Sequence, residues 1–120
     1  MEEQAFVVET DQLRPGVPLV RARGRVDLAA AAALASVVHR CLDLSPWAVV
    51  LDLSAVSELR AGAVESLVDL AYHAGTGDIG LYVVTAGGAV DQVLGGGQVD
   101  GLFDIHHSID SADRAMGGRT

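Results

Sequence analysis

Lysine is absent from the sequence, and the eight basic residues are all arginines. Without a lysine amine, Schiff-base chemistry and the phosphate loop of P-loop nucleotide hydrolases are excluded. Sixteen acidic residues outnumber the arginines and give a formal net charge of -8, and the arginines form no basic stripe. Nucleic acids and anionic membranes select for concentrated positive charge. These partners are therefore disfavoured, and a protein or a small molecule is the expected partner.

Cysteine is nearly absent too. Cys41 stands alone, which excludes an intramolecular disulfide and a cysteine-based metal cluster. The histidines lack the spacing of metal ligands, because His106 and His107 point to opposite faces of a predicted strand and His39 and His73 fall on different predicted helices. We therefore predict no metal site and no cofactor.

Long apolar runs are missing as well. No segment approaches the roughly 20 apolar residues that a membrane-spanning helix needs. The acidic N-terminus, MEEQ, lacks the positive charge and the apolar stretch of a signal peptide. The sequence therefore predicts a cytoplasmic protein without membrane insertion.

The residues that are present predict one compact domain with an aliphatic core, because 50% of the 120 residues are hydrophobic and only 4% are aromatic. Their spacing predicts the element order β-β-α-β-α-β-α-β-α. This order is typical of an α/β fold with a mixed, mostly parallel sheet and crossover helices. The predicted strands cover residues 6–10, 17–26, 47–53, 81–86 and 102–107, and the predicted helices 28–44, about 61–74, 89–94 and 108–116.

Local signals support the first elements of this prediction. DQLRPG, residues 11–16, predicts a turn between the first two strands. The second strand alternates Val20, Ala22 and Gly24 with three arginines, which indicates one packed face and one solvated face. Asp27 follows directly and is the predicted N-cap of the first helix, because its carboxylate can accept from free backbone N–H groups.

Two glycine-rich stretches match ligand-binding loops in composition only. GTGDIG, residues 75–80, fits Gly-x-Gly-x-x-Gly, but it follows a helix and precedes a strand, the reverse of a dinucleotide-binding loop. We interpret it as a helix end and turn. GGAVDQVLGGG, residues 87–97, lacks the lysine or hydroxyl residue that should follow a phosphate loop, and is interpreted as a mobile segment leading into a connector over 95–101.

Nucleophilic chemistry also lacks a motif. No histidine lies beside a serine or beside Cys41 in a recognised nucleophile arrangement. We therefore predict no catalytic residues and a chain that is not an enzyme.

Three stretches in order resemble a known family: GRVDLAAAAAL at the start of the first helix, the central strand VVLDLSAV, and VLGGGQVDGLFDIHHSIDSA near the C-terminus. The pattern resembles a STAS domain, the fold of bacterial anti-sigma factor antagonists and of the cytoplasmic tails of sulfate transporters. The resemblance spans residues 5–116 and leaves residues 117–120 as a short C-terminal tail.

The resemblance implies a phosphorylation motif that this chain has lost. In anti-sigma factor antagonists, Asp-Ser-Ser-Gly follows the central strand, and the anti-sigma kinase phosphorylates its first serine. In register with that strand, the four positions hold Arg60, Ala61, Gly62 and Ala63. Phosphoryl transfer needs an oxygen nucleophile, which a methyl group does not have. No phosphorylation is therefore expected at residue 61.

Two other hydroxyls lie close to this motif in the sequence. Ser57 is near the end of the central strand, and Ser66 falls on the second turn of the following helix. Phosphorylation of either would place the phosphate near Glu58 or Glu65, and like charges repel. We interpret both as ordinary surface serines, although their modification stays open.

The family's contact surface implies where a partner would bind. It consists of the end of the central strand, the second helix and the loop before the first helix. On this chain those positions are Asp27, Ser57, Glu58, Arg60, Ala61, Gly62 and Glu65. The implied function is a regulatory module that docks on an anti-sigma factor or a related protein.

Other functions stay open at this point. A nucleotide or another anion could bind at the helix N-terminus near Gly62, where backbone N–H groups and Arg60 attract negative charge. The module could also serve as a regulatory subunit of a transporter or of a signalling complex. Whether the chain forms a homodimer is also open.

Overall fold

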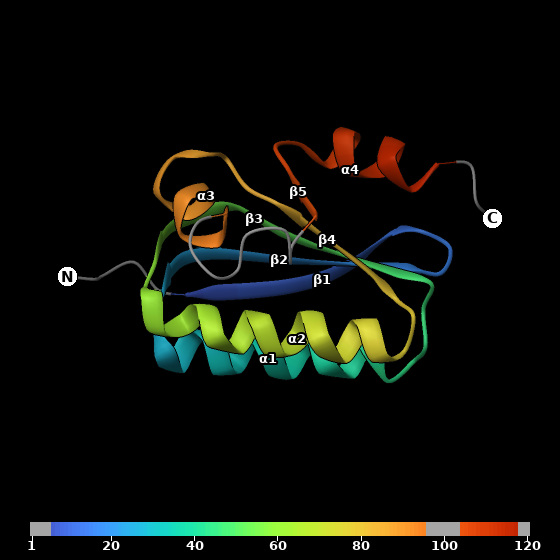
Figure 1. Cartoon of the computed structure of the whole chain (residues 1–120), viewed down its shortest axis with the longest axis horizontal. Helices are drawn as coiled ribbons and strands as arrows, with labels where there is room; N and C mark the ends of the chain where they lie inside the picture. The colour runs from blue at the N-terminus through green and yellow to red at the C-terminus, as the bar shows by residue number, and fades with distance from the viewer. Residues whose placement is uncertain (1–5, 96–103, 118–120) are drawn as a thin grey trace.

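A computed structural model describes residues 6–95 and 104–117 (Figure 1). Its element order confirms the predicted β-β-α-β-α-β-α-β-α arrangement, with one short 3₁₀ helix added. The strands are β1 Val7–Arg14, β2 Val17–Val26, β3 Ala48–Leu59, β4 Gly80–Val84 and β5 Asp104–His106. The helices are α1 Leu28–Leu42, η1 Ala61–Ala63, α2 Val64–Thr76, α3 Gly88–Gly95 and α4 Ile109–Met116. Residues 96–101 of the predicted connector, the first two residues of the predicted last strand (102–103) and the tail residues 118–120 lie outside the described residues.

The sheet has the order β1-β2-β3-β4-β5, in which β1 and β2 are antiparallel and the other neighbours are parallel. The predicted mixed, mostly parallel sheet is therefore confirmed. Helices α1 and α2 lie side by side on one face of the sheet, whereas α4 lies on the other (Figure 1). Because β2 and β3 are parallel neighbours, they terminate at the same end of the sheet, where Val26 pairs with Leu59. The helices α1 and α2 follow these strands, so both helices start at that end of the sheet.

Two apolar clusters hold these layers together. The larger one joins the sheet to α1 and α2 and includes the fully buried Leu34, Leu51 and Leu67. The smaller one lies under α4, where Ala112 and Met116 pack against strand residues such as Val17, Leu19, Val50 and Val84. Aliphatic side chains dominate both clusters, as the composition predicts.

The turn between the first two strands is tighter than predicted. β1 continues through most of DQLRPG, and Arg14 pairs with Val17, so the loop contains only Pro15 and Gly16. Proline presets its own φ, and Gly16 adopts φ +81°, a conformation that favours glycine. The preceding polar residues remain in a strand because β1 is at the sheet edge and exposes them to solvent.

The central strand is longer than predicted. β3 extends to Leu59, and its register with β2 shifts twice. Near its end, Gly24 pairs with Val56 and Arg25 with Glu58, so Ser57 is an extra, bulged residue. The apolar run predicts only the part of the strand that is buried on both faces. Backbone pairing with β2 continues beyond it.

Candidate functional site

The junction between β2 and α1 forms one side of the site. Asp27 is the N-cap of α1, and its Oδ1 accepts a hydrogen bond from the Ala30 backbone N–H at 2.9 Å. The predicted cap is confirmed. The cap fixes the first turn of α1, which begins at Leu28, directly after the end of β2.

The junction between β3 and α2 forms the other side. The Arg60 N–H donates to the Val26 carbonyl at 3.1 Å, and the Ala63 N–H donates to the Arg60 carbonyl at 2.9 Å. The first bond holds the end of β3 against the end of β2, and the second closes the turn that follows β3. The chain then makes the 3₁₀ turn η1 before α2 starts at Val64, and the N-cap residue Ala63 makes no side-chain capping bond. The first backbone N–H groups of α2 therefore have no side-chain cap.

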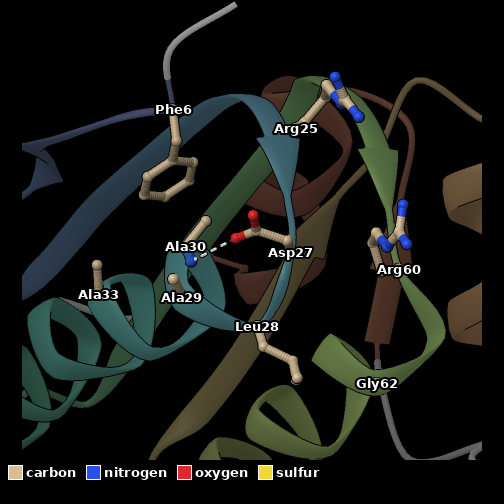
Figure 2. A pocket seen from close by; sticks show the side chains of 9 residues that line it. All are labelled: Phe6, Arg25, Asp27, Leu28, Ala29, Ala30, Ala33, Arg60 and Gly62. Atoms are coloured by element: carbon tan, nitrogen blue, oxygen red, sulfur yellow. Dashed lines mark hydrogen bonds between the residues drawn. The ribbon is translucent and has the colours of Figure 1, made fainter.

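An open groove of about 920 Å³ lies between the two junctions (Figure 2). Its apolar part includes Leu28, which is 66% exposed although it is the first residue of a helix. Gly62 lies against Leu28, because a Cβ atom built on Gly62 would come within 3.3 Å of Leu28 Cδ2. The groove is lined by Phe6, Arg25, Asp27, Leu28, Ala29, Ala30, Ala33, Arg60 and Gly62.

Two arginines and one glutamate form a charged rim beside this groove. Arg25 Nε lies 3.3 Å from Glu58 Oε1, and Arg60 Nη1 lies 3.4 Å from Glu58 Oε2. The two arginine side chains are 59% and 58% exposed. Pairs of such exposed charges contribute about 0–1 kcal/mol to stability. The rim therefore matters more for what it presents to solvent than for the fold.

The structure brings only part of the predicted docking set into the groove. Asp27, Arg60 and Gly62 line it, and Glu58 is joined to its rim by ion pairs. Ala61 opens η1 between them. The predicted residues that do not line the groove are the bulged, exposed Ser57 and the exposed Glu65 in the first turn of α2.

Sequence reasoning missed Phe6, Arg25, Leu28 and three alanines of α1 as groove residues. For Arg25 a signal was available, since the alternation of β2 assigned it to the solvated face beside Asp27. For Leu28 no local signal exists, because an exposed leucine and a buried one look the same in a helical pattern. Phe6 reaches the groove only because β1 pairs with β2.

A second polar cluster joins β5 to α4. His106 Nδ1 lies 2.8 Å from Ser111 Oγ, and His106 Nε2 lies 3.0 Å from Asp104 Oδ1, a contact without hydrogen-bond geometry. The arrangement of Ser111, His106 and Asp104 resembles a Ser-His-Asp triad, which the sequence did not predict. The Ser111 backbone N–H donates to the Ser108 side chain at 3.0 Å, so it is not available as an oxyanion donor. We interpret the cluster as a link that holds α4.

The other groups considered for chemistry lie outside the groove. His39 of α1 and His73 of α2 stack edge to face with ring centroids 4.8 Å apart. Burial raises the pKa of the Cys41 thiol, an effect that the neighbouring Arg40 partly opposes. Within the part of the chain that the structure describes, no group of three or more histidine, cysteine, aspartate or glutamate side chains is arranged to hold a metal.

The fold and the site together define a small α/β domain whose helix starts meet at the end of its central strands. The family model of the STAS domain matches residues 10–112. The chain belongs to the STAS domain family. A search of curated proteins finds no match.

Several solved structures share the fold. A crystal structure of an anti-sigma factor antagonist from Mycobacterium paratuberculosis has a TM-score of 0.83 and 27% identity, covering 92% of this chain and 93% of that chain. The anti-sigma factor antagonist SpoIIAA in its unphosphorylated form has a TM-score of 0.76 and 10% identity, with 95% and 100% covered. The NMR structure of TM1081 has a TM-score of 0.75 and 15% identity, with 99% and 94% covered.

Membership of the STAS domain family and the likeness to the anti-sigma factor antagonist from Mycobacterium paratuberculosis support a regulatory role for the chain. Among the described residues, no helix is both long and apolar enough to cross a membrane.

Proposed function

We propose that the chain is a regulatory protein-binding module that docks on an anti-sigma factor or a related regulatory protein. The docking surface is the groove between the starts of α1 and α2, together with its rim of Arg25, Glu58 and Arg60. The observation that carries the proposal is the position of this open groove at the carboxyl ends of β2 and β3. Binding sites of open α/β sheets lie at this edge. A partner of this kind would operate in the cytoplasm.

We further propose that no phosphoryl group at residue 61 switches this docking. Ala61 has no oxygen to accept a phosphoryl group. Arg60 stands where the resembled motif has an aspartate and reverses the charge at that position. Like charges facing each other across an interface cost several kcal/mol. A partner that recognises the aspartate of the usual motif would therefore bind this chain poorly, and the partner of this chain must suit the arginine.

The lack of a switch is tested by phosphotransfer. The purified chain is incubated with an anti-sigma kinase encoded by the same organism and with radiolabelled ATP. We expect no label in the chain. The Ala61→Ser variant is the matched control. If it is labelled, the kinase recognises the rest of the surface and only the acceptor oxygen is missing from the unmodified chain. Rapid labelling of the unmodified chain at Ser57 or Ser66 would contradict an unswitched module.

Docking itself is tested by purifying tagged full-length chain from the native cells and identifying co-purifying proteins by mass spectrometry. We expect an anti-sigma factor or another regulatory protein, with direct binding then measured by calorimetry on the purified pair. A second assay uses the Arg60→Asp/Ala61→Ser double variant with a standard anti-sigma kinase. Gain of binding supports a surface that has changed its partner, whereas unchanged binding points to another face.

A second candidate function is an anion or nucleotide sensor at the start of α2. It is favoured by the missing side-chain cap on that helix and by the nearby Arg60. Glu58 opposes it by occupying one Arg60 nitrogen. Titration calorimetry with GTP, ATP and simple anions separates the two functions. A sensor gives binding heat with one of these ligands, whereas a module that docks only on a protein gives none with them. A transporter or signalling subunit would instead co-purify with its own assembly.

A further inference from the structure

We propose that the groove binds a partner segment in which an apolar side chain stands close to a carboxylate. This inference rests on the proposed docking function and specifies the chemistry of the segment that the same surface recognises. It follows from two independent properties of the groove, an exposed leucine in its lining and an excess of hydrogen-bond donors around it.

The apolar anchor of the groove is Leu28. Its side chain is 66% exposed, between Phe6 and the alanines of the first turn of α1 on one side and Gly62 on the other. The cap at Asp27 fixes the backbone directly before Leu28. Because the backbone of this turn is already ordered, a partner that covers Leu28 restricts only the rotamers of its side chain. An aliphatic or aromatic side chain of the partner is the group that gains most by covering it.

The groups around this anchor mostly offer donors. Each guanidinium has five N–H groups, and Arg25 and Arg60 each use one nitrogen to contact Glu58. Glu58 has both of its oxygens in these ion pairs, and Asp27 Oδ1 is taken by the cap. Three of the four carboxylate oxygens of Glu58 and Asp27 therefore have a partner, whereas most N–H groups of the two guanidinium groups do not contact Glu58.

The start of α2 adds to this excess of donors. Its N-cap residue Ala63 makes no side-chain bond, so no side-chain cap covers the partial positive charge at this end of the helix. A carboxylate of the partner can accept hydrogen bonds from guanidinium nitrogens that do not contact Glu58. A lysine or arginine in the same place would lie beside Arg25 and Arg60, and the carboxylate of Glu58 is already paired with both.

The test uses a phage-displayed library of random peptides, selected on the folded full-length chain. We expect the selected peptides to carry leucine, isoleucine, methionine or phenylalanine within a few residues of aspartate or glutamate. Their affinity, measured by fluorescence anisotropy, should fall about tenfold or more in Leu28→Asp and in Arg60→Glu. It should also fall as the salt concentration rises.

Two substitutions of the same kind elsewhere on α1 and just after it serve as controls. Leu44 is 79% exposed and Arg40 is exposed, and neither lines the groove. Leu44→Asp and Arg40→Glu should leave peptide affinity unchanged. Circular dichroism and thermal melting of all four variants verify that each one is folded.

Several outcomes overturn the inference. These are a library without binders, selected peptides that are basic, and peptides that bind Leu28→Asp as tightly as the unmodified chain. Failure of this inference can be distinguished from failure of the proposed docking function. A co-purified regulatory partner that binds the unmodified chain and Leu28→Asp equally rejects the inference and shows that the partner does not use the apolar part of the groove, while regulatory docking itself stands. Peptides that behave as expected, with no regulatory partner in the cell, reject the docking function and retain the groove chemistry.

Discussion

Asp27 serves both the fold and the candidate site. Its carboxylate accepts the Ala30 N–H and so starts α1, and the same residue lines the groove in which Leu28 is exposed. An N-cap and a contact residue make different demands on the side chain. The cap needs only an oxygen acceptor, whereas a charged partner would sense the negative charge. Substitutions can therefore separate the two roles.

We expect Asp27→Ala to lower the free energy of unfolding by about 1 kcal/mol, because the first turn of α1 loses its cap. Asp27→Asn keeps an oxygen acceptor and should lower the free energy of unfolding by only about a few tenths of a kcal/mol, since asparagine caps about as well as aspartate. Urea denaturation followed by circular dichroism measures both. Equal stability of Asp27→Ala and the unmodified chain would show that the cap contributes nothing. If Asp27→Asn binds a partner differently while remaining stable, the charge takes part in recognition.

At the scale of elements, the β1–β2 hairpin depends on its two-residue loop. Gly16 has φ +81°, and a Cβ atom added there would come within 2.9 Å of Trp47 Nε1. Both the backbone conformation and the close indole therefore require glycine. Gly75, near the end of α2, has no such constraint, because a Cβ atom added there meets nothing within 4 Å.

We expect Gly16→Ala to lower the free energy of unfolding by about 1–3 kcal/mol, since the new methyl group strains the turn and collides with Trp47. The matched substitution Gly75→Ala should be neutral or stabilising by up to about 1 kcal/mol, because alanine favours helix more than glycine does. Chemical denaturation of both variants provides the comparison. Two variants of equal stability would contradict the requirement for glycine in the hairpin loop.

At the scale of the whole molecule, Arg14 joins the hairpin to the last helix. Its Nη2 donates to the Gly117 carbonyl at 2.9 Å, and its Nε lies 3.3 Å from Asp113 Oδ1, an ion pair without hydrogen-bond geometry. The guanidinium carbon also lies 5.3 Å from the centre of the Trp47 ring. The contacts with Asp113 and Gly117 connect residues about a hundred positions apart in the chain and hold α4 on its face of the sheet.

Arg14→Met should lower the free energy of unfolding by about 1–3 kcal/mol, because methionine fills part of the space but provides no donor for the Gly117 carbonyl. It should also change the fluorescence of Trp47, the single tryptophan. Arg23→Met is the control, since Arg23 makes an exposed ion pair with Glu9 at 3.6 Å and should matter by less than about 0.5 kcal/mol. Equal losses in the two variants would show that Arg14 does not anchor α4.

Much of this fold follows from local patterns. The cap at Asp27, the alternation of β2 and the apolar run of β3 each reflect the neighbours of a residue in the chain, and the structure confirms them. The errors occurred where pairing partners decide the outcome. β1 and β3 are longer than predicted because backbone hydrogen bonds to β2 continue where side-chain patterns stop.

The candidate site was predicted only in part for the same reason. The family resemblance identified Arg60 and Gly62, both of which line the groove. It did not identify Arg25, which comes to lie beside Glu58 through the parallel register of β2 and β3. The contact between His106 and Ser111 likewise depends on the turn from β5 into α4.

By itself, the sequence determined the class of the fold, the order of its elements and the absence of a phosphate acceptor at residue 61. These depend on residue type and on short-range spacing, which any stretch of chain carries with it. Only the tertiary structure decided that Leu28 is exposed, that Gly62 lies against it and that Glu58 connects two arginines. Exposure and ion pairing depend on which segments meet in space. For this chain that meeting occurs where two parallel strands end and two helices begin.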